Sequence, residues 1–368
     1  MTEKRTEISE IGEFGLIERI KRSVSISRPE TRTGIGDDAK MLVELEFYVF
    51  DDDYRSARDR RYHDLRTAGW YIEDYHILQG TKEEFLVGAL RRHLERSGIP
   101  VEFSKGEWGP GQQEINLRYA DFLETADRHT LFKHAAKEVA WQNNVAVTFM
   151  AKLDESLAGS SMHLHSSLWT DGGARAAFDA PPPAPGALPD LCRWWLGGLM
   201  HHARACTLLF APYVNSYKRF RAGSFAPTAI AWAHDNRTAG FRIVGHGRSL
   251  RVECRIPGAD ANPYLAFAAT IAAGLHGIAA RLPAPRLHEG NAYADDRLPQ
   301  AANDCRYRPR STPARIDPSI NPCCPAASGS SGPRRAPARS RRRTRSPSPI
   351  ARSRRSATAC RSGPTAMT

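Results

Sequence analysis

Carboxylates alternate with apolar side chains from Leu42 to Phe50, a pattern typical of a β-strand. Side chains two apart on a strand share a face, so Glu44 and Glu46 point one way while Leu45 points into a core. Two like charges on one face repel, and burying them without a counter-charge is costly. The stretch therefore predicts either a solvated strand face or a site where a bound cation removes the repulsion.

The same alternation recurs along the chain, which favours the cation site. Glu107 and Glu114 flank a Pro-Gly turn, and His163 and His165 share one face of a second expected strand. A third stretch puts three charged residues on one face: Arg251, Glu253 and Arg255. Sites that are rich in oxygen donors with little nitrogen favour Mg²⁺ or Mn²⁺ over zinc.

Cationic side chains accumulate in the second half of the chain. They include Lys218, Arg219, Arg237, Arg242, Arg248, Arg251 and Arg255. Arginine binds phosphate and carboxylate oxygens bidentately, and acids with metals beside arginines are what phosphoryl transfer from ATP requires. A surface salt bridge explains any one of these arginines better, but not the set. The sequence contains no GxxxxGKS or GxxxxGKT phosphate loop, so we expect metals and side chains to hold ATP.

The net charge of +12 comes from the C-terminal segment. Residues 301–368 contain 15 arginines, no lysine and two acids. Of the 52 basic and 40 acidic residues in the whole chain, 37 basic and 38 acidic residues therefore lie in 1–300. The rest of the chain is thus nearly neutral, and nucleic acid is not an expected partner except non-specifically through this segment.

The N-terminus lacks the apolar stretch of a signal peptide, and the most apolar segment, 191–210, carries charged residues. The seven cysteines form no CxxC pair. Together these features predict a cytoplasmic protein without a membrane span.

Local patterns predict several elements. A capping box at Thr81 to Glu84 is expected to start a helix that carries Leu86, Leu90 and Leu94 and ends before Gly98. Asn262 and Pro263 are expected to begin an apolar helix that runs to about 282. The other expected elements are a helix over 127–142, strands over 145–150 and 162–169, and a Pro-rich loop over 180–189.

Several of these segments, in order, resemble the glutamine synthetase family over about residues 41–300. They are Glu44 to Tyr48, Glu107 to Glu114, Gly159 to Leu168, Asn215 to Arg219, Asn236 to Arg242, Arg251 to Arg255 and Ala261 to Leu265. The resemblance implies an α+β fold, in which a curved, mainly antiparallel sheet lines an active-site basin and helices lie outside. It also implies a homo-oligomeric ring.

The resemblance further implies particular roles. One metal site would use Glu46, Glu107 and Glu114, and another Glu44, His163 and Glu253. ATP would contact Glu102, Tyr119, His165, Ser167, Arg242 and Arg251. The substrate would contact Gly159, Arg219, Arg237 and Arg255, and these three arginines are also the catalytic candidates. The cofactors would be ATP and two or more Mg²⁺ or Mn²⁺ ions. The implied reaction phosphorylates the side-chain carboxylate of glutamate, and an amine then displaces phosphate to form an amide.

Two positions depart from the family pattern. Phe225 stands where the family has a catalytic glutamate that helps receive a proton from ammonium, and Ala158 stands where it has an asparagine. A phenyl ring cannot accept a proton. These changes lead to the hypothesis that the amine is organic, such as a polyamine, rather than ammonia.

The two ends support other interpretations. Residues 1–40, with Gly34 to Ala39, resemble the start of thiamine-monophosphate kinase, so a fragment of that kinase is one alternative. Residues 301–368, rich in Arg, Pro and Ser, predict a disordered segment, and an RNA-binding protein is a second alternative.

Overall fold

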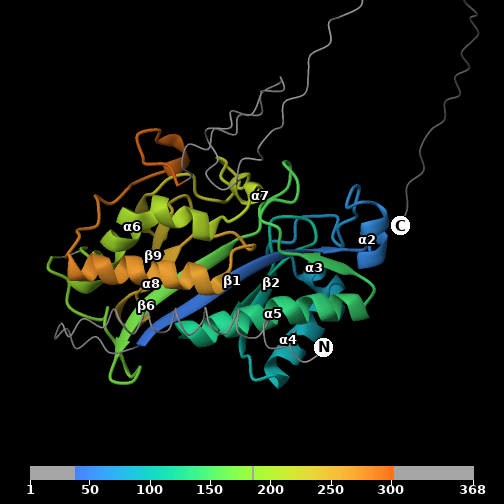
Figure 1. The fold of residues 1–368 in the computed structure, drawn as a ribbon, viewed down its shortest axis with the longest axis horizontal. Helices are drawn as coiled ribbons and strands as arrows, with labels where there is room; N and C mark the ends of the chain where they lie inside the picture. Colours follow the sequence, from blue (N-terminus) through green and yellow to red (C-terminus); the bar gives the residue numbers. More distant parts are fainter. Residues whose placement is uncertain (1–37, 185, 302–368) are drawn as a thin grey trace, which may run out of the picture. The chain divides into compact units, whose positions relative to one another are not determined.

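The computed structural model describes residues 38–184 and 186–301 (Figure 1). Its strands are β1 (Asp38–Phe50), β2 (Val101–Gly106), β3 (Gln112–Leu117), β4 (Ala120–Asp121), β5 (Ala146–Thr148), β6 (Met162–Thr170), β7 (Arg175–Ala176), β8 (Trp232–His234), β9 (Phe241–Val244) and β10 (Arg251–Cys254). Its helices are α2 (Tyr54–Asp59), α3 (Ile77–Lys82), α4 (Glu84–Arg96), α5 (Phe122–Gln142), α6 (Asp190–Phe210), α7 (Val214–Tyr217) and α8 (Pro263–Ala279), with 3₁₀ turns η1 (Gly247–Ser249) and η2 (Ala292–Ala294).

The strands form one sheet in the order β2-β3-β1-β6-β10-β9-β8. Neighbours along it are antiparallel except for β8 and β9, which are parallel. The long strand β1 lies in the middle, between β3 and β6, and runs across the fold in Figure 1. The expected α+β fold with a mainly antiparallel sheet and outer helices is confirmed.

Helices α4, α5, α8 and α6 contact one another in that order and cover one face of the sheet. The residues of β1 that alternate with the acids point into this layer, where Phe47 meets Phe132 of α5 with ring centroids 6.1 Å apart. Helices α6 and α8 approach closely because glycines face each other: a Cβ added at Gly198 would lie 2.1 Å from the carbonyl oxygen of Ala273. The opposite face of β1 is left for Glu44 and Glu46.

Most predicted elements are present, with shifted boundaries. The helix that carries Leu86, Leu90 and Leu94 is α4, and all three leucines are buried. The capping box predicted for it was wrong: Thr81 lies in the preceding helix α3 and donates to the carbonyl of Ile77. The side chain of Asn262 caps α8 as expected, accepting from the amide of Leu265, but α8 ends at Ala279 rather than near 282.

Other boundaries also differ, and those of the strands depend on pairing partners that the sequence does not show. Strand β1 starts four residues before Leu42, since Asp38 to Met41 pair with β6. Helix α5 starts at Phe122 rather than 127, and β5 covers only 146–148 of the expected 145–150. Strand β10 ends at Cys254, so Arg255 follows the strand directly.

The interpretations of the chain ends, kinase-like for 1–40 and RNA-binding or disordered for 301–368, lie outside the described residues apart from 38–40 and 301. Among the helices that the structure describes, none is long and apolar enough to cross a membrane.

Candidate active site with two side-chain clusters

Three carboxylates from neighbouring strands form the first group, here called the acid cluster: Glu46, Glu107 and Glu114. One oxygen from each lies within 4.8 Å of the others. The sheet register creates the cluster, because Glu46 of β1 stands directly opposite Glu114 of β3 and Glu107 follows β2. Burial, and then the charge of Glu107, raises the pKa of Glu46 to about 8. The same causes raise the pKa of Glu114 well above its usual range, so the cluster lacks positive charge.

Lys105 supplies part of that charge. Its ammonium contacts the Glu107 carboxylate and lies 3.9 Å from Glu114 and 4.0 Å from Asp74. Burial lowers the pKa of Lys105, but the charges of Glu114 and Glu107 outweigh burial and raise it overall. Sequence reasoning missed this lysine, although its position two residues before Glu107 was a usable signal.

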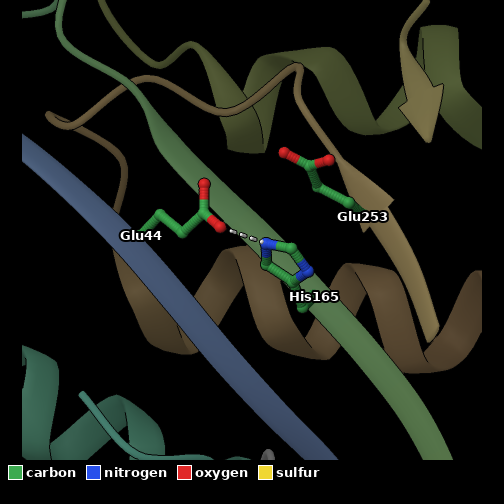
Figure 2. A group of neighbouring side chains, drawn as sticks. All are labelled: Glu44, His165 and Glu253. Carbon is green, nitrogen blue, oxygen red and sulfur yellow. Dashed lines mark hydrogen bonds and ion pairs between the residues drawn. The ribbon is translucent and has the colours of Figure 1, made fainter. Parts of the chain in front are cut away.

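Glu44, His163, His165 and Glu253 form the second group, here called the His–Glu cluster. Figure 2 shows Glu44, His165 and Glu253 pointing toward one another from β1, β6 and β10. One oxygen of Glu44 is 3.1 Å from His163 Nδ1, and the other is 2.9 Å from His165 Nε2. His165, predicted beside the nucleotide, therefore also contacts the predicted metal ligands.

Burial, and then the nearby Arg255 guanidinium, lowers the pKa of His163 to about 4. Burial alone would raise the pKa of Glu44, but hydrogen bonds from His163 and His165 lower it overall, so this carboxylate stays ionised. A neutral His163 that donates from Nδ1 keeps a lone pair on Nε2, which is buried without a hydrogen-bond partner among the described residues.

Arginines surround the buried Glu253. Arg255 Nη1 lies 2.6 Å from Glu253 Oε1, and the Arg242 guanidinium contacts Glu253 Oε2. Arg251 Nε donates to His165 Nδ1 at 3.2 Å. Arg219 is buried, and its guanidinium donates to the carbonyls of Ile256 and Arg255 at 2.7 and 2.8 Å. These hydrogen bonds fix the backbone of the two residues that follow β10, Arg255 and Ile256.

Two further predicted substrate residues take different positions. Arg237 is exposed on the loop between β8 and β9. Gly159 lies against Arg219: a Cβ there would come 2.7 Å from the Arg219 Cγ. Its carbonyl accepts from Gln112 Nε2 at 3.1 Å, which ties the segment before β6 to the turn of the acid cluster.

A cavity of about 390 Å³ opens beside the His–Glu cluster. Five of the six residues predicted to contact ATP line it: Glu102, Tyr119, His165, Ser167 and Arg251. The sixth, Arg242, lies instead at Glu253. Sequence reasoning did not identify Trp169 and Lys40, which also line the cavity. Tyr119 stacks on Trp169 with centroids 6.1 Å apart, and Lys40 Nζ lies 4.9 Å from a Trp169 ring centroid.

An aromatic pair lies between the acid cluster and the arginines. Trp108 follows Glu107 directly, and its ring centroid is 5.1 Å from that of Phe225. Both rings are about half exposed, and the Phe225 carbonyl is 3.5 Å from Arg255 Nη2. Phe225 has a φ of 63°, which a bulky residue rarely adopts.

Comparison with known proteins agrees with this arrangement. A family model described as "Glutamine synthetase, catalytic domain" matches residues 22–311. The chain belongs to the glutamine synthetase family. The match begins inside the 1–40 segment and includes both clusters, the cavity and the aromatic pair.

Within the glutamine synthetase family, similar relatives are named for organic amines. The chain is 48% identical over 267 residues to γ-glutamylethanolamide synthetase GlnA4 of Streptomyces coelicolor. The alignment covers 73% of this chain and 56% of that protein. The chain is 38% identical over 260 residues to glutamate–isopropylamine ligase of Pseudomonas sp., covering 70% and 56%. A solved GmaS/ADP complex matches with a TM-score of 0.63 and 30% identity, covering 72% of this chain and 60% of that one. The chain thus spans little more than half the length of these curated relatives.

Proposed function

We propose that this member of the glutamine synthetase family joins the γ-carboxylate of glutamate to an organic amine at the expense of ATP. The observation that carries the proposal is the adjacency of the two clusters. Glu44 and Glu46 lie two residues apart on the same face of β1, so the His–Glu cluster and the acid cluster are neighbours, with the cavity on one side and arginines on another.

Both clusters suit divalent cations. The acid cluster offers three carboxylates, and burial together with the charge of Glu107 raises the pKa values of two of them, Glu46 and Glu114. The His–Glu cluster offers two carboxylates and two imidazoles. Mg²⁺ and Mn²⁺ prefer such oxygen-rich donor sets. When bound, divalent cations neutralise phosphate oxygens and stabilise charge in phosphoryl transfer.

The cavity suits the nucleotide. The stacked Tyr119 and Trp169 offer an aromatic wall for a base, and Lys40 and Arg251 lie around its rim. A nucleotide held there would direct its phosphates toward the His–Glu cluster, which shares His165 with the cavity lining.

The chemistry follows in two balanced steps. A γ-carboxylate oxygen of glutamate attacks the terminal phosphorus of ATP, and ADP leaves with the electrons of the broken bond. The amine nitrogen then attacks the acyl carbon of this acyl phosphate, phosphate leaves, and the nitrogen loses a proton. Phosphorylation is needed because a free carboxylate is a poor electrophile. We assign the stabilisation of the developing charge to the guanidinium of Arg255, which lies beside the His–Glu cluster.

The Trp108–Phe225 pair supports an organic amine. It presents two half-exposed rings at the junction of the acid cluster and Arg255, where the alkyl group of an organic amine would bury apolar surface that ammonium lacks. The ethanolamide and isopropylamine ligases among the relatives fit this interpretation.

The test is glutamate-dependent phosphate release from ATP, with Mg²⁺ or Mn²⁺, using ammonium, ethanolamine, isopropylamine and putrescine. We expect kcat/KM to be higher for at least one organic amine than for ammonium. Phe225→Glu should shift preference toward ammonium, whereas the matched control Phe225→Leu should not. If the unaltered chain prefers ammonium, the proposal that the amine is organic is refuted. If no amine supports glutamate-dependent phosphate release, the proposed ligase activity is refuted.

A further inference from the structure

Two buried acids that the proposed chemistry does not use lie behind the turn of the acid cluster. Glu73 is 1% exposed and Glu83 is 3% exposed. Glu73 precedes α3, and Glu83 is the N-cap residue directly before α4. Buried carboxyl groups are costly unless hydrogen bonds satisfy them, so their partners indicate what they hold in place.

Glu73 holds the turn at two points. Its backbone amide donates to the carbonyl of Glu107 at 3.1 Å, and its Oε1 accepts from the amide of Gly111 at 3.1 Å. The turn is closed within itself by the amide of Glu107 and the carbonyl of Gln112 at 2.7 Å. Glu73 therefore fixes both the start and the apex of the loop that brings Glu107 toward Glu46.

Glu83 supports the far end of the same turn. Its Oε2 accepts from Gln113 Nε2, and the next residue along β3 is Glu114. The carboxyl groups of Glu73 and Glu83 also hydrogen-bond to each other. The Oε2 atom of Glu73 is buried, and no other described residue donates to it. Burial, and then the charge of Glu73, raises the pKa of Glu83 to about 8, which favours a proton on Glu83 in that bond.

The space around Glu73 fits this side chain closely. A Cβ added at Gly69 would lie 1.8 Å from Glu73 Oε1 and 2.5 Å from the amide nitrogen of Gly111. A Cβ added at Gly106 would lie 2.5 Å from the Glu73 Cβ. Glycines on both sides therefore let the backbone of the turn approach the carboxylate.

We propose that Glu73, supported by Glu83, is a positioning residue that holds the 107–114 turn so that the carboxylates of Glu107 and Glu114 meet Glu46 at the spacing of one divalent cation. The inference rests on the proposed function in one respect, that the acid cluster binds such an ion. It assigns a role to two acids that touch neither substrate nor nucleotide in the proposed reaction.

The first measurement needs no metal, so it is independent of the proposed function. In hydrogen–deuterium exchange of the metal-free chain, Glu73→Ala should speed exchange of the 107–114 peptide by about tenfold, the effect of losing a buried hydrogen bond. Glu73→Gln should exchange like the unaltered chain, because its carbonyl accepts from Gly111 and its amide donates to Glu83. Glu73→Asp is a milder change that can be used if the alanine variant does not fold. Its 107–114 peptide should exchange at an intermediate rate.

The second measurement is Mn²⁺ binding followed by titration calorimetry. Glu73→Ala should weaken binding to the acid cluster about tenfold or more and leave binding to the His–Glu cluster unchanged. The control is Thr270→Ala, which removes a buried hydroxyl that donates to the carbonyl of Ala266 within α8 and should change neither the turn nor Mn²⁺ affinity. The inference is overturned if Glu73→Ala leaves exchange of the turn unchanged, if the turn loosens without weakening Mn²⁺ binding, or if Thr270→Ala has the same effects. Failure of the unaltered chain to bind Mn²⁺ would overturn the proposed metal site, and with it the positioning role, while the exchange result would still report on the turn.

Discussion

The buried carboxylate of Glu253 is the counter-charge for two arginines. Replacing Glu253 by Gln tests how much this charge contributes to the free energy of unfolding. The side chain is fully buried, 2.6 Å from Arg255 Nη1 and in contact with Arg242. Glu253→Gln keeps the size of the side chain and removes its charge. Two guanidinium groups with little access to water would then face each other without the acid that separates them.

The magnitude follows from two independent arguments. Removing one partner of a buried ion pair costs about 3–5 kcal/mol. Burial alone would raise the pKa of Glu253, but the charge of Arg255, followed by His165, His163 and Arg242, lowers it from 4.5 to about 2. A shift of that size corresponds to about 3 kcal/mol of stability. Because domains are stable by about 5–15 kcal/mol, the variant should lose a large fraction of its free energy of unfolding.

Urea unfolding of the metal-free chain at pH 7, with EDTA, measures this loss. We expect the free energy of unfolding to fall by about 3–5 kcal/mol with an unchanged m-value. Because the folded pKa lies below the unfolded one, the stabilisation is complete above about pH 4.5 and is lost as the pH falls toward 2, so the difference between the two chains should shrink over that range. The control Glu138→Gln removes an exposed acid on α5 and should change stability by less than about 0.5 kcal/mol. A loss below about 1 kcal/mol, or a difference that does not shrink in acid, would refute the reasoning.

Two other predictions concern the helix layer. Gly198→Ala should destabilise the fold by about 1–3 kcal/mol or more in urea unfolding, because the new Cβ would meet the carbonyl of Ala273; the control Gly80→Ala, which has open space around it, should be neutral or stabilising, and equal effects would contradict the close packing of α6 and α8. His129 is buried, and burial followed by the charge of Lys133 lowers its pKa well below 6.5, so the unfolded chain binds the extra proton as the pH falls below 6.5. His129 therefore lowers the stability of the unaltered chain as the pH falls from 7.5 to 5, so the free energy of unfolding of His129→Leu should rise relative to that of the unaltered chain over this range; a difference that does not change with pH would show that His129 is not buried in its neutral form.

The strand-face pattern anticipated much of the site because it depends on local geometry. Alternation places Glu44 and Glu46 on one face of β1 whatever the surrounding fold. The register between strands does not follow from that pattern. Only the pairing of β1 with β3 and β6 puts Glu46 opposite Glu114 and Glu44 opposite His163. The grouping of acids from distant segments therefore came from the family resemblance rather than from periodicity.

Residues outside regular patterns were missed. Glu73 lies between elements in a segment without periodicity, and only the folded turn shows that it accepts from Gly111. The capping box at Thr81 failed because a hydroxyl can also donate to the carbonyl four residues back in a helix, and here it bonds Ile77. Local hydrogen-bonding alternatives of this kind are decided by tertiary packing.

The central claim is that an acyl phosphate forms on glutamate where the acid cluster, the His–Glu cluster and Arg255 meet. The direct test uses glutamate labelled with ¹⁸O in its γ-carboxylate, together with ATP, Mg²⁺ and the preferred amine, and measures the mass of the phosphate released. The account predicts one ¹⁸O atom in each phosphate, because the carboxylate oxygen leaves with phosphorus. Phosphate that is free of ¹⁸O while the amide forms would contradict it.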